Sequence, residues 1–156
     1  MKKVLTLLIS HGAALALGFG LGVYLLPILT AERSPDSAEL AASAQAAVYS
    51  ATLTRDLRGS DFVHWGEGTI SVSPTQIIHE GKLSPGPDYK VYLVPEFAED
   101  EAEFEALKDR SVRVGDVKAF DGFIIDLLAD VDIEAYNTVL VWCEAFGEFI
   151  TAARYR

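Results

Sequence analysis

The chain has 156 residues, half of them hydrophobic, and a formal net charge of −10 at pH 7. This length accommodates one compact domain plus an appendage and excludes two full-sized domains. Because phosphate binding requires a basic surface, the acidic charge excludes a nucleic-acid-binding function and argues against electrostatic docking on anionic lipid.

The first predicted element is a membrane-spanning helix. No charged residue occurs between Val4 and Leu29, a run longer than the ~20 residues needed to cross a hydrocarbon core. It is also longer than the apolar core of a cleaved signal peptide, and Leu29 is a poor match to the small residue required three positions before a cleavage site at Ala31. We therefore predict that residues 1–30 form an uncleaved anchor, with a signal sequence as the alternative. Two lysines precede the run, so the positive-inside rule keeps the N-terminus in the cytoplasm and exports the remainder, to the periplasmic side in a bacterium.

Residues 31–47 form a predicted linker or stalk. Ser34–Ser37 is a plausible helix start, and Ala38–Ala47 has high helical propensity. The segment has no apolar stripe, so a helix here is expected to bury little surface.

The remaining residues, 48–156, alternate short apolar runs with turn signals. This pattern is typical of an all-β fold, either a small antiparallel β-sandwich or an open barrel. Between two of the strands, Pro85 and Gly86 indicate a type II turn in which the glycine takes a positive φ angle. The predicted strands are Tyr49–Leu53, Gly66–Ser73, Gln76–His79, Tyr89–Val94, Val112–Val117, Phe123–Leu127, Thr138–Phe146 and Phe149–Ala153.

A short acidic helix is predicted over Glu96–Lys108. Its carboxylates form a solvated face, and Phe97, Phe104 and Leu107 are the expected buried contacts. The segment lacks the ligand spacing and central glycine of an EF-hand loop, so we predict no calcium site.

The strand predicted over Thr138–Phe146 contains the single cysteine of the chain. Trp142 and Cys143 belong to opposite faces of this strand, and the other residues of both faces are mostly apolar. The strand should therefore be covered on both sides.

Three motifs of the β region occur in the order found in the DM-thirteen domain family: Gly66–Thr69, Gly86–Leu93 and Tyr136–Cys143. The chain resembles this family from Val48 to Ala153. The family comprises small extracytoplasmic β domains, found alone in bacteria and beside haem-binding DOMON domains in animals. The resemblance implies a role in electron transfer with a redox partner.

The resemblance also implies a site. In the family a cysteine acts as a bare thiol or as a ligand to a prosthetic group such as haem, and the matching residue is Cys143. Trp142, Asp88 and Tyr89 also match the family motifs. The CxxCH attachment signature is absent, so any haem would be bound non-covalently.

The residues themselves leave three states open for Cys143. An exported cysteine with no partner in its own chain is a protected thiol, a link to another chain, or a ligand. As a protected thiol it packs like a small hydrophobic side chain. A reactive thiol requires a positive neighbour or a helix N-terminus. The negative charge of Glu144 would make the thiol less reactive, although the Glu144 side chain should face the other side of the strand.

The histidines are candidate second ligands. His64 is expected in a turn and His79 at a strand end, and we interpret both as surface or edge residues. Nothing in their spacing brings them together with Cys143, so no metal site is predicted. The sequence also lacks the motifs of phosphate binding, nucleophilic hydrolysis and zinc proteolysis, which disfavours a stand-alone enzyme.

Two functions follow from the sequence. The first is a single-pass, membrane-anchored extracytoplasmic electron-transfer module that acts through Cys143. The alternative is a non-catalytic protein-interaction domain in which Cys143 and Trp142 only fill the core.

Overall fold

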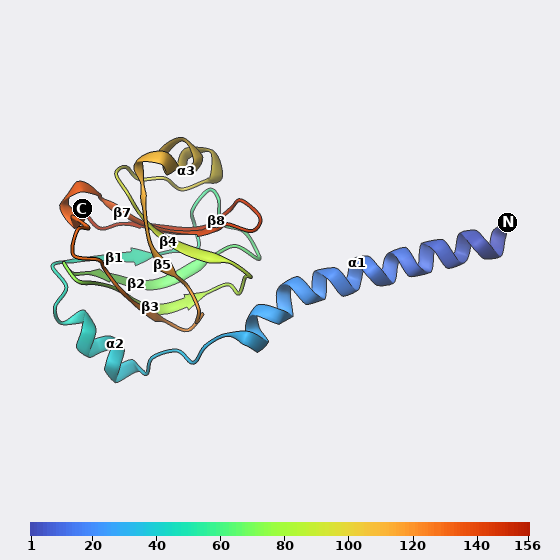
Figure 1. The fold of residues 1–156 in the computed structure, drawn as a ribbon, viewed down its shortest axis with the longest axis horizontal. Helices are drawn as coiled ribbons and strands as arrows, with labels where there is room; N and C mark the ends of the chain where they lie inside the picture. The colour runs from blue at the N-terminus through green and yellow to red at the C-terminus, as the bar shows by residue number, and fades with distance from the viewer.

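Two four-stranded antiparallel sheets form the body of the chain, as the computed structural model of residues 1–156 shows (Figure 1). The first sheet has the order β1 (Tyr49–Leu53), β2 (Gly66–Val72), β3 (Gln76–Leu83) and β6 (Phe123–Asp126). The second has the order β5 (Val112–Asp116), β4 (Tyr89–Val94), β7 (Thr138–Cys143) and β8 (Glu148–Arg154). The predicted all-β class is confirmed, and all eight predicted strands are present.

Strand β7 is buried along its whole length. Its Val139, Val141 and Cys143 face the main core between the two sheets. Trp142 faces a second, smaller core under helix α3 (Glu101–Leu107). The prediction that this strand is covered on both sides is therefore confirmed, and its alternating pattern assigns the two faces correctly.

Two predicted boundaries differ from the structure. Strand β7 ends at Cys143 instead of Phe146, because the next residues form a tight turn in which the Gly147 N–H donates to the Cys143 carbonyl (2.9 Å). Helix α3 begins at Glu101 instead of near Glu96, because the Asp100 side chain caps it by accepting from the N–H of Glu103 (2.9 Å). A 3₁₀ turn, Lys108–Arg110, follows the helix.

His79 is not the edge residue that we predicted. It lies in the middle of β3, between β2 and β6, and is fully buried against the Phe123 ring (centroid distance 5.1 Å). The strand continues to Leu83, four residues beyond the predicted end, because Glu80 and Gly81 pair with β2.

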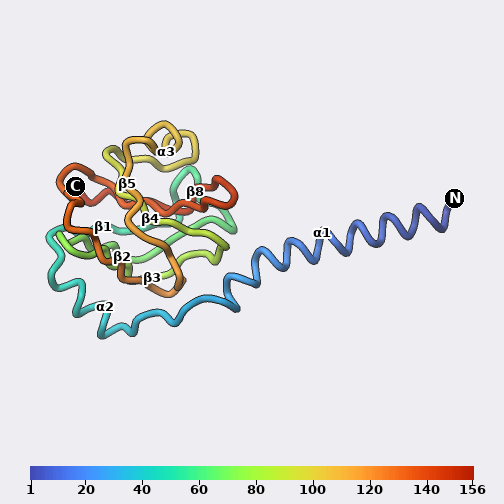
Figure 2. The backbone as a smooth tube through the Cα atoms, viewed as in Figure 1, coloured from blue at the N-terminus to red at the C-terminus, as the bar shows by residue number.

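Two helices precede the sandwich. Helix α1 (Lys2–Thr30) is long and apolar enough to cross a membrane, a property that a signal sequence shares. Its last turns lie beside one end of the sandwich, and the rest projects away from it (Figures 1 and 2). Helix α2 (Ser37–Ala44) is capped by Asp36 and buries Leu40 where the helix meets β3 and β6. The segment predicted as a linker is thus partly in contact with the first sheet. A 3₁₀ turn, Ile133–Ala135, leads towards β7.

Candidate functional site

Cys143 lies at the end of β7, directly opposite Tyr89 of β4. Only 2% of the residue is exposed. Burial raises the pKa of the Cys143 thiol, and hydrogen bonding to the backbone of Phe146, Ala145 and Asp88 opposes this increase without cancelling it. The sulfur therefore stays a protonated thiol at neutral pH, held by the turn that follows the strand.

A cavity of about 230 Å³ reaches Cys143 from the end of the sandwich. Its lining includes the side chains of Cys143, Tyr89 and His64. Its walls are completed by the loop over residues 85–87, Phe146, and the part of α1 around Tyr24. The structure thus brings together three of the predicted site residues, which come from three separate segments of the chain.

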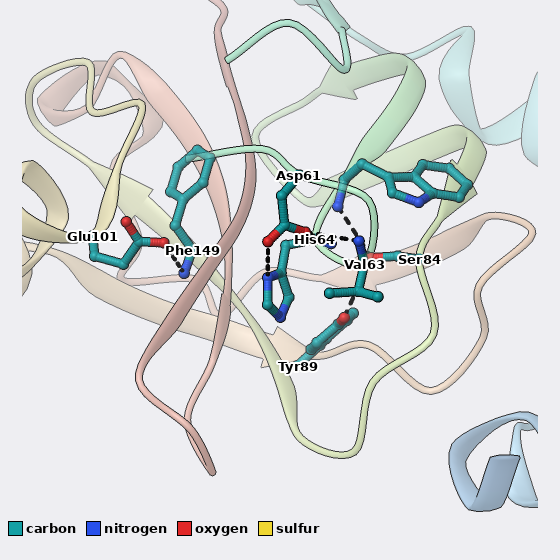
Figure 3. Close-up of polar contacts among 8 residues, drawn as sticks. Asp61, Val63, His64, Ser84, Tyr89, Glu101 and Phe149 are labelled. Atoms are coloured by element: carbon teal, nitrogen blue, oxygen red, sulfur yellow. Dashed lines mark hydrogen bonds and ion pairs between the residues drawn. The ribbon is translucent and has the colours of Figure 1, made fainter. Parts of the chain in front are cut away.

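Asp61 fixes the position of His64 (Figure 3). One oxygen of the Asp61 carboxylate accepts the backbone N–H groups of Val63 and His64, both at 2.7 Å. The other oxygen lies 3.1 Å from Nδ1 of the His64 ring. Burial alone would raise the pKa of Asp61, but the hydrogen bonds from Val63 and His64 outweigh it and hold this pKa below its usual value. The carboxylate therefore stays ionised and selects the His64 tautomer with a proton on Nδ1, leaving Nε2 as a free acceptor.

Tyr89 is buried beside Cys143, and burial raises its pKa to about 12. The Tyr89 hydroxyl lies 3.4 Å from Oγ of Ser84. Oγ of Ser84 in turn accepts the backbone N–H of Trp65 (3.1 Å). This arrangement connects the loop that carries His64 to the loop that leads into β4 (Figure 3).

Gly86 is required for space and not for a positive φ angle. The residue does not adopt the left-handed conformation, so the type II turn that we predicted here is wrong. A Cβ atom at this position would overlap the ring of Tyr89. The glycine thus allows the loop to lie directly against the tyrosine that lines the cavity.

We expect Gly86→Ala to destabilise the domain by about 1–3 kcal/mol, because the added methyl group forces the Tyr89 ring out of its packed position. Chemical denaturation of the full chain measures this loss, with Pro87→Ala as the control. Equal stability of the two variants would contradict the assigned role of Gly86.

Trp142 and Asp88 lie outside the cavity. The Trp142 ring packs against Phe104 (centroid distance 4.9 Å) on the opposite side of the second sheet. The Asp88 carboxylate lies 2.7 Å from Nζ of Lys90, and its backbone carbonyl accepts the N–H of Glu144 (3.0 Å). Asp88 therefore helps to hold the turn after Cys143 and does not face the cavity.

Glu144 lies on the opposite side from Cys143, as predicted. Its carboxylate accepts a hydrogen bond from Tyr92 and forms an ion pair with Lys108 (2.8 Å). Both partners belong to the α3 side of the sheet, where the Lys108 ammonium lies 5.2 Å from the Trp142 ring centroid. The negative charge of Glu144 is therefore neutralised away from the thiol.

Asp61, Ser84 and Phe146 contribute to the site but were not among the residues predicted from the sequence. Asp61 had a recognisable signal in the sequence. In an Asx turn, an aspartate side chain accepts backbone N–H groups two or three residues further along the chain, as Asp61 does from Val63 and His64. Ser84 and Phe146 carry no signal of their own, since only the folding of the loops brings Ser84 to Tyr89 and Phe146 to the cavity.

Comparisons with known proteins agree with these observations. Residues 57–155 match the family model described as electron transfer DM13. No curated protein and no solved structure matches the chain. The matched segment covers more than half of the chain and contains every residue of the sandwich that lines the cavity. The chain therefore belongs to the DM13 electron-transfer domain family.

Proposed function

We propose that the chain is a membrane-anchored electron-transfer module whose β domain lies outside the cytoplasm and whose Cys143 thiol is the redox group. Membership of the electron-transfer family supports the reaction class. The length and composition of α1, preceded by the charges of Lys2 and Lys3, support the anchor and its direction.

One observation carries the proposal: Cys143 and His64 line the same cavity. Loss of one electron from a thiol produces a thiyl radical and releases the thiol proton. His64 presents an unoccupied ring nitrogen that can accept this proton, and the Asp61 carboxylate stabilises the resulting imidazolium. The electron passes to a one-electron acceptor on a redox partner. Return of an electron and of the proton from His64 restores the thiol.

The burial of Cys143 favours electron transfer over disulfide exchange. Exchange requires a thiolate that collides with a second sulfur, whereas Cys143 is buried and its raised pKa keeps it protonated. Loss of an electron requires no collision with a second sulfur, so the burial of Cys143 does not prevent it. The same burial disfavours a disulfide link to another chain.

A haem does not fit this site. The cavity of about 230 Å³ is smaller than the roughly 300–1,000 Å³ pockets that hold drug-sized ligands, and a haem is larger than most of these. We therefore assign no step to a prosthetic group.

The alternative function, an interaction domain in which the cysteine only fills the core, is favoured by the 2% exposure of Cys143. The two functions differ in whether the sulfur exchanges electrons in the folded state.

Oxidation of the full chain by ferricyanide tests the proposal. In detergent micelles, the folded protein is expected to reduce ferricyanide, and Cys143→Ser to abolish the reduction. His64→Gln should slow it by about tenfold or more, because general-base assistance typically contributes about 10²–10⁴-fold. Stopped-flow absorbance follows the reaction.

His11→Gln is the matched control, since this histidine lies in α1 and away from the cavity. A thiol count after unfolding shows that each variant begins with a reduced Cys143. If the folded protein carries one free thiol per chain yet reduces ferricyanide no faster than Cys143→Ser, the electron-transfer role of Cys143 is rejected and the interaction domain is supported.

A further inference from the structure

We propose that the end of the sandwich nearest α1 inserts into the outer leaflet of the membrane that α1 spans. This end carries an apolar surface, here called the apolar tip, formed by Phe62, Val63, Pro87 and Phe146. The proposal goes beyond the anchor itself, because it assigns a second membrane contact to the β domain. It rests on the proposed anchor and not on the redox role of Cys143.

The apolar tip exposes large side chains without a partner. Phe62 is 94% exposed and Phe146 is 51% exposed. They belong to two loops far apart in the sequence, yet Val63, Pro87 and Phe146 line adjoining cavities at the same end of the sandwich. Clustered, exposed aromatic side chains on loop tips mark a surface that contacts another apolar phase.

The depth of the apolar tip follows from its position along α1. About 20 helical residues cross the hydrocarbon core, so a span that starts after Lys3 reaches the outer boundary near Val23. The cavities between the tip and α1 are lined by helix residues from Phe19 to Thr30, including Tyr24. Tyrosine is enriched at the membrane–water interface. The tip therefore lies level with the outer interface of the bilayer.

The direction of α1 agrees with this placement. The helix leaves the sandwich at the end where the β7–β8 turn lies and projects away from it (Figure 1). A bilayer around the projecting part of α1 therefore faces this end of the domain and not the opposite end. The C-terminus and the β2–β3 turn lie at the far end.

The charge of the chain identifies the kind of lipid contact. A net charge of −10 argues against electrostatic attraction to anionic headgroups. The carboxylate next to Phe62, that of Asp61, accepts two backbone N–H groups and lies against the His64 ring. The tip thus contacts the membrane through aromatic and aliphatic side chains, and zwitterionic lipid is sufficient for it. Insertion brings the mouth of the Cys143 cavity to the membrane surface.

Site-specific fluorescence on the full chain tests this contact. Phe62→Cys and Phe146→Cys are each made in a Cys143→Ser background, labelled with the environment-sensitive fluorophore NBD, and reconstituted into phosphatidylcholine vesicles. Leu128→Cys is the matched control. Leu128 is an exposed apolar residue (73% exposed), and it lies at the far end, because the neighbouring Leu127 N–H donates to Thr75 of the β2–β3 turn (2.7 Å).

The labels at positions 62 and 146 are expected to be quenched by nitroxide lipids and to resist aqueous iodide at least threefold better than the label at position 128. The background lacks the redox thiol, so the result is independent of the electron-transfer proposal. If the labels at both tip positions are as accessible to iodide as the label at position 128, membrane insertion of the tip is rejected.

Discussion

Replacing Trp142 by alanine is expected to lower the free energy of unfolding by about 3–5 kcal/mol. The ring is 2% exposed and packs against Phe104 at a centroid distance of 4.9 Å. Its removal leaves a cavity beneath α3 that rigid neighbouring strands cannot close. Chemical denaturation of the full chain in micelles, followed by circular dichroism, measures the loss.

Trp142→Phe distinguishes the packing role of the aromatic ring from a role of the indole in electron transfer. The indole N–H of Trp142 is buried and donates to no acceptor, so phenylalanine removes an unsatisfied polar group while retaining an aromatic ring against Phe104. We expect less than half of the stability loss of Trp142→Ala. Ferricyanide reduction should be unchanged, because Trp142 and Cys143 face opposite sides of the sheet. Loss of electron transfer in a stable Trp142→Phe protein would instead place the indole in the path of the electron.

The fold was predictable because local patterns dominate it. Strand β7 shows this best, because its side chains alternate between two apolar faces. One face packs in the core between the two sheets, and the other packs in the smaller core under α3. Ser73 illustrates the turns, since its side-chain oxygen accepts the N–H of Gln76 (2.9 Å) and closes the hairpin between β2 and β3. Such features depend on neighbours within a few residues, so the sequence contains them.

The site was only partly predictable because it depends on loop closure. Cys143 and Tyr89 were identified through the family motifs, and their direct pairing follows from the register of β4 and β7. The contribution of His64 and Asp61 requires a loop that returns to the same end of the sandwich. No hydrophobic periodicity in the sequence predicts that this loop folds back to the end of the sandwich where Cys143 lies. The family motif contains Trp142 beside Cys143, yet adjacent residues of a strand point in opposite directions.

The burial of His79 was not predictable for a related reason. Histidine at an expected strand end is usually solvated, and the chain gave no indication that β3 continues and is flanked on both edges. In the structure, Nε2 of His79 donates to the carbonyl of Glu67 (3.0 Å), and Nδ1 is buried without a partner. Burial lowers the pKa of His79, and the hydrogen bond to Glu67 offsets this only in part.

Acidification is therefore expected to destabilise the protein through His79. In the unfolded chain the imidazole titrates near its ordinary pKa of about 6.5, whereas in the folded protein it stays neutral to lower pH because a second N–H would be buried without an acceptor. The unfolded state thus binds more protons below about pH 6.5. The free energy of unfolding should fall as the pH decreases through this range, with a slope approaching about 1.4 kcal/mol per pH unit.

His79→Gln isolates this contribution, since its amide can donate to the Glu67 carbonyl but does not titrate. Urea denaturation of both proteins between pH 7.5 and 5 should give a sloping profile for the parent chain and a nearly flat one for the variant. The carboxylates with lowered pKa values, such as Asp61 and Glu144, contribute only at lower pH. Parallel profiles would mean that the folded protein accommodates a charged His79, and that Nδ1 finds an acceptor when it is protonated.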